Sequence, residues 1–155
     1  MLKISTIILT LFPIFLICGK VQADSLVPLY KLNLNIEHDF TDASYLFSRC
    51  SSLSAATYRV MGNNDNFTQN LRLYHKTLHE AFFVLASYAE SRAHGSDTSN
   101  SEEISKLLAS RVINLTEIYS KEMEINYLRS GSHFSSDLMT EDLRLCGELS
   151  QSNMR

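Results

Sequence analysis

The chain has 155 residues, of which 45% are apolar, with 14 basic and 17 acidic side chains and a formal net charge of −3. This length and composition suit one globular domain with a single core. The net negative charge argues against a nucleic-acid-binding protein, which needs a basic patch, and against electrostatic attachment to anionic lipid.

Residues 1–23 have the three parts of a secretory signal peptide. Lys3 supplies the positive start, residues 4–18 form an almost unbroken apolar run, and Val21 and Ala23 are the small residues that a signal peptidase reads. We therefore predict cleavage after Ala23 and export to the periplasm or the cell exterior. Cleavage removes two lysines and leaves 132 residues with 12 basic and 17 acidic side chains, a net charge of −5.

Two alternatives to cleavage at this site are weaker. An uncleaved membrane anchor needs about 20 apolar residues, whereas the run from 4 to 18 has 15 and contains Pro13. A lipoprotein attached at Cys18 would have a small residue in front of the cysteine, and Ile17 stands there.

Residues 24–38 fit no helix and are predicted to form an extended or partly disordered arm. Leu32, Leu34 and Ile36 alternate with polar residues, as they would in a strand. One interpretation is an arm that lies on the helices. The other is a segment whose backbone pairs with another exported protein.

Four segments have the apolar period of amphipathic helices. They are predicted at about 39–61, 66–94, 100–130 and 136–150, and residues 151–155 form a C-terminal tail. Residues typical of helix starts precede or open the first three segments, and glycines follow them: Asp39, Asn66 and Ser99, then Gly62, Gly95 and Gly131. Short connections between four such helices predict an all-α, antiparallel up-down-up-down bundle over residues 39–150.

The cysteines test this topology. Cleavage would leave Cys50 and Cys146, and two cysteines in an exported protein of this size favour one disulfide over two free thiols. In the predicted bundle the first and fourth helices are antiparallel neighbours. At 1.5 Å per residue, Cys50 and Cys146 lie roughly 18 and 15 Å from the same end of the bundle, so the two side chains can meet.

The sequence contains no motif that specifies a reaction or a cofactor, and we expect neither. The best metal candidates are His75 and His79, one helical turn apart, but two ligands fall short of the three or four that zinc takes. A metal protein or enzyme that uses His75, His79 and Glu122 is the rival hypothesis to a binding protein. Metal analysis of the purified protein separates the two.

Charged residues interrupt the apolar faces of the last two helices. Arg111 and Glu122 fall within the face of the third helix, and Asp142 falls within the face of the fourth. A buried charge needs a partner. We predict that Arg111 pairs with Asp142 and that Glu122 pairs with His75, both as structural contacts that fix the register of the helices.

Residues 45–53, Tyr-Leu-Phe-Ser-Arg-Cys-Ser-Ser-Leu, resemble the stretch around the first cysteine of small exported proteins of marine bacteria. That group has no assigned activity, so the resemblance implies only a periplasmic location. Aromatic residues outside the core stripes, such as Phe83 and Tyr127, are candidates for a partner surface together with the arm. The sequence therefore predicts a non-enzymatic binding or accessory protein.

Overall fold

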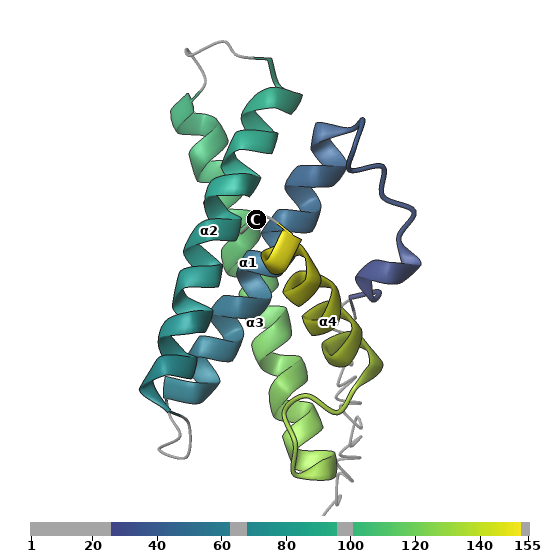
Figure 1. Cartoon of the computed structure of the whole chain (residues 1–155), viewed down its shortest axis with the longest axis vertical. Helices are drawn as coiled ribbons and strands as arrows, with labels where there is room; N and C mark the ends of the chain where they lie inside the picture. Colours follow the sequence, from purple (N-terminus) through teal and green to yellow (C-terminus); the bar gives the residue numbers. More distant parts are fainter. Residues whose placement is uncertain (1–25, 63–67, 96–100, 153–155) are drawn as a thin grey trace, which may run out of the picture.

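The computed structural model describes residues 26–62, 68–95 and 101–152, and this part of the chain is helical (Figure 1). It contains one 3-10 turn, η1 (Leu29–Lys31), and four α-helices: α1 (Phe40–Gly62), α2 (Gln69–Ala93), α3 (Ser101–Ser130) and α4 (Asp137–Ser152). None of these helices is long and apolar enough to cross a membrane. The predicted all-α, up-down-up-down bundle is confirmed. The predicted signal peptide lies outside the described residues.

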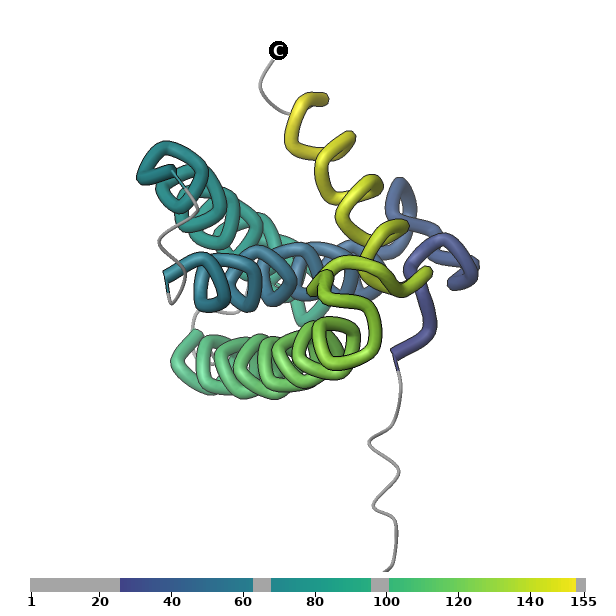
Figure 2. Tube along the Cα trace, turned by 90° about the horizontal axis from the view of Figure 1, so that it is seen from below, coloured from purple at the N-terminus to yellow at the C-terminus, as the bar shows by residue number. Residues whose placement is uncertain are grey.

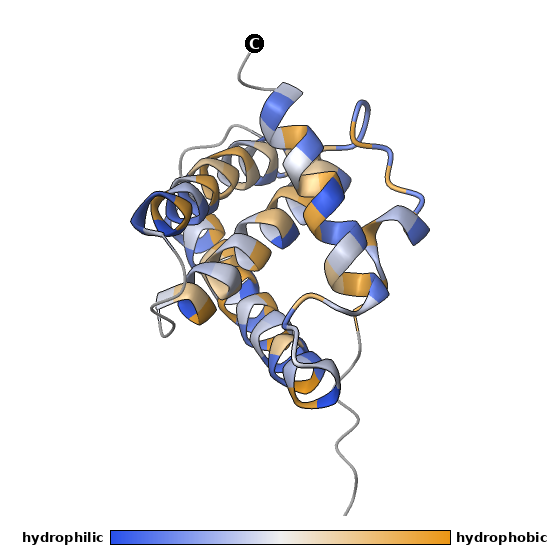
Figure 3. Ribbon diagram, turned by 60° about the horizontal axis from the view of Figure 1, so that its bottom comes forward, coloured by the Kyte–Doolittle hydropathy of each residue, from blue (hydrophilic) through white to orange (hydrophobic). Residues whose placement is uncertain are grey.

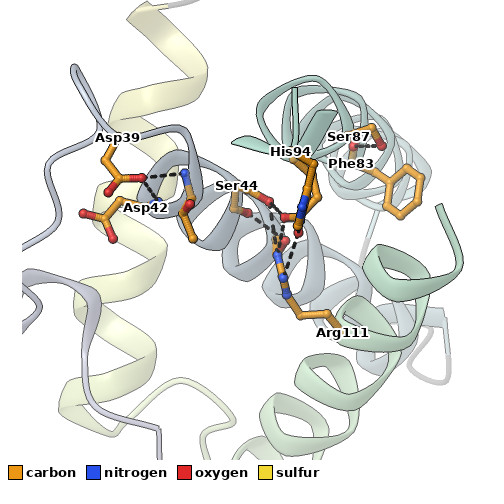
Figure 4. A network of polar contacts seen from close by, with 10 residues as sticks. Asp39, Asp42, Ser44, Phe83, Ser87, His94 and Arg111 are labelled. Carbon is orange, nitrogen blue, oxygen red and sulfur yellow. Dashed lines mark hydrogen bonds and ion pairs between the residues drawn. The ribbon is translucent and has the colours of Figure 1, made fainter. Parts of the chain in front are cut away.

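Two helix starts show how side chains satisfy the free N–H groups of a first turn. A carboxylate oxygen of Asp39 accepts a hydrogen bond from the N–H of Thr41 at 2.7 Å, so the predicted cap of α1 is confirmed (Figure 4). The cap of α2 is Thr68, whose hydroxyl accepts from the N–H of Leu71 at 3.3 Å. The predicted cap of α2, Asn66, lies outside the described residues.

Glycines end two of the helices. Gly95 and Gly131 follow α2 and α3 with φ angles of 77° and 73°, in the left-handed region that other residues rarely adopt. Both are helix stops, as the sequence predicts. Gly62, also expected beyond a helix end, is instead the last residue of α1.

Helix α1 is the centre of the molecule and contacts α2, α3 and α4 (Figure 1). Most of its side chains are buried, and many of them are serine or alanine, which allow neighbouring helices to approach closely. The buried hydroxyls need acceptors, and the helix supplies them. Ser48 donates to the carbonyl of Ser44 and Ser52 donates to the carbonyl of Ser48, both at 2.7 Å.

The predicted disulfide is present between Cys50 of α1 and Cys146 of α4, with a Cα–Cα distance of 5.5 Å. Both cysteines are buried in the main apolar core, together with Leu46 and Leu53 of α1. The other three helices and η1 contribute Leu29, Phe82, Tyr119, Met123 and Met139. Figure 3 shows that polar and apolar residues alternate along each helix, as expected for helices with one face in the core and the other in water.

Helix α4 does not run along α2 or α3. Its main contacts are with α1 and with η1, and Figure 2 shows it diverging steeply from the direction of α1 and α3. The arm beside it is packed on the molecule. Leu29 is buried, and Leu26, Leu32 and Leu34 are partly buried against the main core, whereas Ile36 is exposed. The described arm forms no strand, and its packing favours the first interpretation, an arm that lies on the helices.

Candidate functional site

A charged cluster joins the arm to three helices. The guanidinium of Arg49 on α1 forms an ion pair with Asp142 on α4, and both side chains are completely buried. Nε of Arg49 donates to the hydroxyl of Tyr119 on α3 at 2.7 Å, and Nη1 donates to the carbonyl of Val27 at 2.8 Å. The second oxygen of Asp142 accepts from the N–H of Leu29 at 2.7 Å. We call these five residues the Arg49 cluster.

The Arg49 cluster is saturated, which indicates a structural role. Burial alone lowers the pKa of the Arg49 guanidinium, but Tyr119 and Asp142 outweigh it and raise this pKa above its usual value. Burial also raises the pKa of the Tyr119 hydroxyl, which therefore stays protonated and donates to Asp142. Each guanidinium nitrogen, both carboxylate oxygens of Asp142 and the Tyr119 hydroxyl already have a partner within the cluster.

A second cluster lies where α1, α2 and α3 meet. Arg111 of α3 contacts both carboxylate oxygens of the buried Glu90 on α2, at 2.7 and 3.2 Å. Ser44 of α1 donates to Glu90, and Nε2 of His94 lies 3.3 Å from the other carboxylate oxygen. Figure 4 shows Ser44, His94 and Arg111 converging on this point. Arg111 and His94 both reach solvent.

The predicted partners of the buried charges are wrong. Arg111 pairs with Glu90, and Asp142 pairs with Arg49, because α4 packs on α1 and η1. The residue of α3 that reaches Asp142 is Tyr119 and not Arg111. No hydrogen bond or ion pair joins His75 to Glu122 in the described part of the chain. The Nδ1 atom of His75 is buried without a hydrogen bond, and burial lowers the pKa of this imidazole.

Replacing Glu90 by glutamine tests the second cluster through the pH dependence of stability. Burial alone would raise the pKa of Glu90, but Arg111 and Ser44 outweigh it and hold the pKa below the usual 4.5. A lowered carboxyl pKa stabilises the fold above pH 4.5, and this stabilisation is lost as the pH falls through the folded-state pKa. In urea unfolding, Glu90→Gln should therefore have a lower free energy of unfolding than the wild type at neutral pH. Below pH 4.5 this free energy should fall less steeply with pH than in the wild type. Glu124 is exposed, and Glu124→Gln should behave as the wild type. If the free energy of unfolding changed with pH equally in all three proteins, Glu90 would not be stabilised as a carboxylate by Arg111 and Ser44.

The candidate metal ligands His75 and His79 are not part of a larger ligand set. No group of three or more histidine, cysteine, aspartate or glutamate side chains that could hold a metal ion occurs among the described residues. The imidazole of His79 contacts Ser51 instead, with Nδ1 lying 2.9 Å from the hydroxyl and 3.1 Å from the carbonyl. Ser51 is completely buried, so this pair cannot present a nucleophile to a substrate.

An apolar groove of about 410 Å³ lies between α2 and the end of α4. It is lined by Thr77, Leu78, Ala81, Phe82, Val84, Leu85 and Ser150. The only polar groups in this lining are two hydroxyls, and that of Ser150 already donates to the carbonyl of Gly147. The groove offers no charge and no free buried polar group, so it suits an apolar occupant.

The α2 side of the groove is part of a longer apolar surface, which we call the α2 strip. It consists of Tyr74, Thr77, Leu78, Ala81, Val84, Leu85 and Tyr88. Tyr74, Val84 and Tyr88 are 42%, 66% and 62% exposed. No member of the strip is charged. Of the aromatics expected outside the core, Tyr127 is exposed and stacks on His133, whereas Phe83 packs against a small second core.

No protein-family model matches this chain, and no curated protein or solved structure matches it.

Arg49 and the groove were both missed at the sequence level. Arg49 is the only charged residue between Asp42 and Arg59. So few charges indicate a helix that is buried on nearly every side, in which a lone arginine must be buried too. The groove depends on the angle of α4, for which the sequence carries no comparable signal.

Proposed function

We propose that this is an exported, non-enzymatic binding protein, and that it binds an α-helix of another protein molecule along the α2 strip. The observation that supports the proposal is the uncharged, solvent-exposed strip beside an apolar groove. A buried disulfide suits the oxidising compartment that the predicted signal peptide implies. We propose that the mature chain begins after Ala23.

The spacing of the strip favours a helical partner. Tyr74, Leu78, Ala81, Leu85 and Tyr88 follow one another at intervals of four, three, four and three residues. This is the apolar repeat with which two α-helices pack side by side. A partner helix can insert its own apolar side chains into the groove, as in other helix-in-groove complexes.

Introducing a charge into the strip tests the proposal. An uncharged fluorescent probe, N-phenyl-1-naphthylamine, should bind the oxidised protein comprising residues 24–155 and gain fluorescence in its apolar groove. We expect Val84→Glu to lose most of this gain, because a carboxylate makes the site unfavourable for an apolar ligand. Ile113→Glu is the matched control, since Ile113 is a β-branched residue of α3 with a similar exposure of 60%. Equal fluorescence for both variants and the wild type would show that the strip is not a binding surface.

A further inference from the structure

The α2 strip reads nearly the same in both directions. Counted from Ala81, tyrosines lie seven residues before and seven residues after it, at Tyr74 and Tyr88. Thr77 and Leu78 lie four and three residues before it, and Val84 and Leu85 lie three and four residues after it. A helix face with this symmetry can pack against an antiparallel copy of itself.

We propose that the strip is occupied by a second copy of this chain, with the two α2 helices antiparallel and a two-fold axis at Ala81. In this arrangement Tyr74 faces the Tyr88 of the other copy, and Leu78 faces its Val84. The two Ala81 methyl groups meet at the axis and let the helices approach closely. The inference rests on the proposed function, because it takes the strip as the contact surface and names its partner.

The area of the strip is close to what a specific dimer needs. The contact from Tyr74 to Tyr88 is about 21 Å long, at 1.5 Å per residue. A fully exposed aromatic side chain presents roughly 150–250 Å², and Tyr74 and Tyr88 keep 42% and 62% of their exposure in one copy. The four tyrosines of a pair then supply about 300–500 Å². With the other exposed members included, pairing two strips removes on the order of 1,000 Å² from water, about the smallest area of a biological interface.

The charges allow this contact. The strip carries no charged residue, and Lys76 and Glu80 at its edge lie 3.9 Å apart within the same chain, so that each copy brings a nearly neutral edge. An interface of this size, without salt bridges between copies, should be reversible. The dimer should therefore dissociate on dilution.

A charge at the two-fold axis tests the geometry. Sedimentation velocity on the oxidised protein comprising residues 24–155 should show a dimer that dissociates on dilution. We expect Ala81→Glu to weaken the dimer at least about tenfold, because two carboxylates then meet at the axis. Ala81→Lys should weaken it likewise. An equal mixture of the two variants should recover the dimer, because glutamate then faces lysine. Ile113→Glu, on α3, should leave it unchanged.

Failure of this inference is distinguishable from failure of the proposed function. A wild-type protein that stays monomeric at every concentration, or a Glu and Lys mixture that associates no better than either variant, would overturn the second-copy assignment. If the wild-type monomer bound the naphthylamine probe and the Val84→Glu variant did not, the strip would be a binding surface for another partner. If neither readout responded to changes in the strip, both proposals would be wrong.

Discussion

Replacing Asp142 by alanine is expected to lower the free energy of unfolding by about 3–5 kcal/mol, the cost of breaking a buried ion pair by removing one partner. The remaining Arg49 guanidinium would be completely buried without its carboxylate, and the N–H of Leu29 would lose its acceptor. Urea unfolding of the oxidised protein measures this change. The free energy should fall while the dependence on urea concentration stays the same.

Asp137 provides the matched control. It is on the same helix and pairs with Lys31 at 3.2 Å, but its side chain is 61% exposed. An exposed pair contributes between zero and about 1 kcal/mol, so Asp137→Ala should have little effect. Equal losses in the two variants would contradict the claim that burial makes the Arg49 cluster important.

The N-terminal arm should respond to the same substitution. Val27 and Leu29 are tied to the molecule through the Arg49 cluster, by one carbonyl and one N–H group. Hydrogen exchange at the Leu29 amide should therefore be fast in Asp142→Ala and slow in Asp137→Ala. This result would show that the Arg49 cluster holds the arm on the helices. The alternation of residues 32–36 alone was also compatible with a strand that pairs with another protein.

The elements of this fold could be predicted because their signals are local. Helix periodicity and the glycines after α2 and α3 depend on residues a few positions apart. The heights of Cys50 and Cys146 along the bundle depend only on the number of residues between each cysteine and the end of its helix, and on the topology. For these reasons the four helices and the disulfide were predictable.

The polar pairs were not predictable in the same way. Steps of 100° around a helix show that Arg111 lies within an apolar face, but not which neighbouring helix that face meets. Here it meets Glu90 of α2, a residue near the end of its helix that carried no signal of burial. The partner of Asp142 depended on the packing of α4 against α1, which brings Asp142 to Arg49. The angle between helices is a property of packing that no single segment specifies.

Removing the disulfide with Cys50→Ala and Cys146→Ala together should lower the free energy of unfolding by about 4 kcal/mol, if the bond acts by restricting the unfolded chain. The bond joins residues 96 positions apart, and long loops gain the most from closure. Urea unfolding of the double variant against the oxidised wild type gives the value. A loss below about 1 kcal/mol would show that the other contacts of α4 are sufficient to hold it.

Combining this change with Asp142→Ala shows whether the two attachments of α4 act together. Cys50 is adjacent to Arg49, and Cys146 lies one helical turn after Asp142, so the disulfide and the ion pair fix the same stretch of α4 to the same stretch of α1. If α4 separates from α1 once the disulfide is absent, water already reaches Arg49. Asp142→Ala would then lower the free energy of unfolding by little more. The two losses would then be far from additive, as expected for neighbouring sites. If they add in full, α4 stays docked without its disulfide, and the Arg49 cluster and the apolar contacts of α4 together position the helix that forms one wall of the groove.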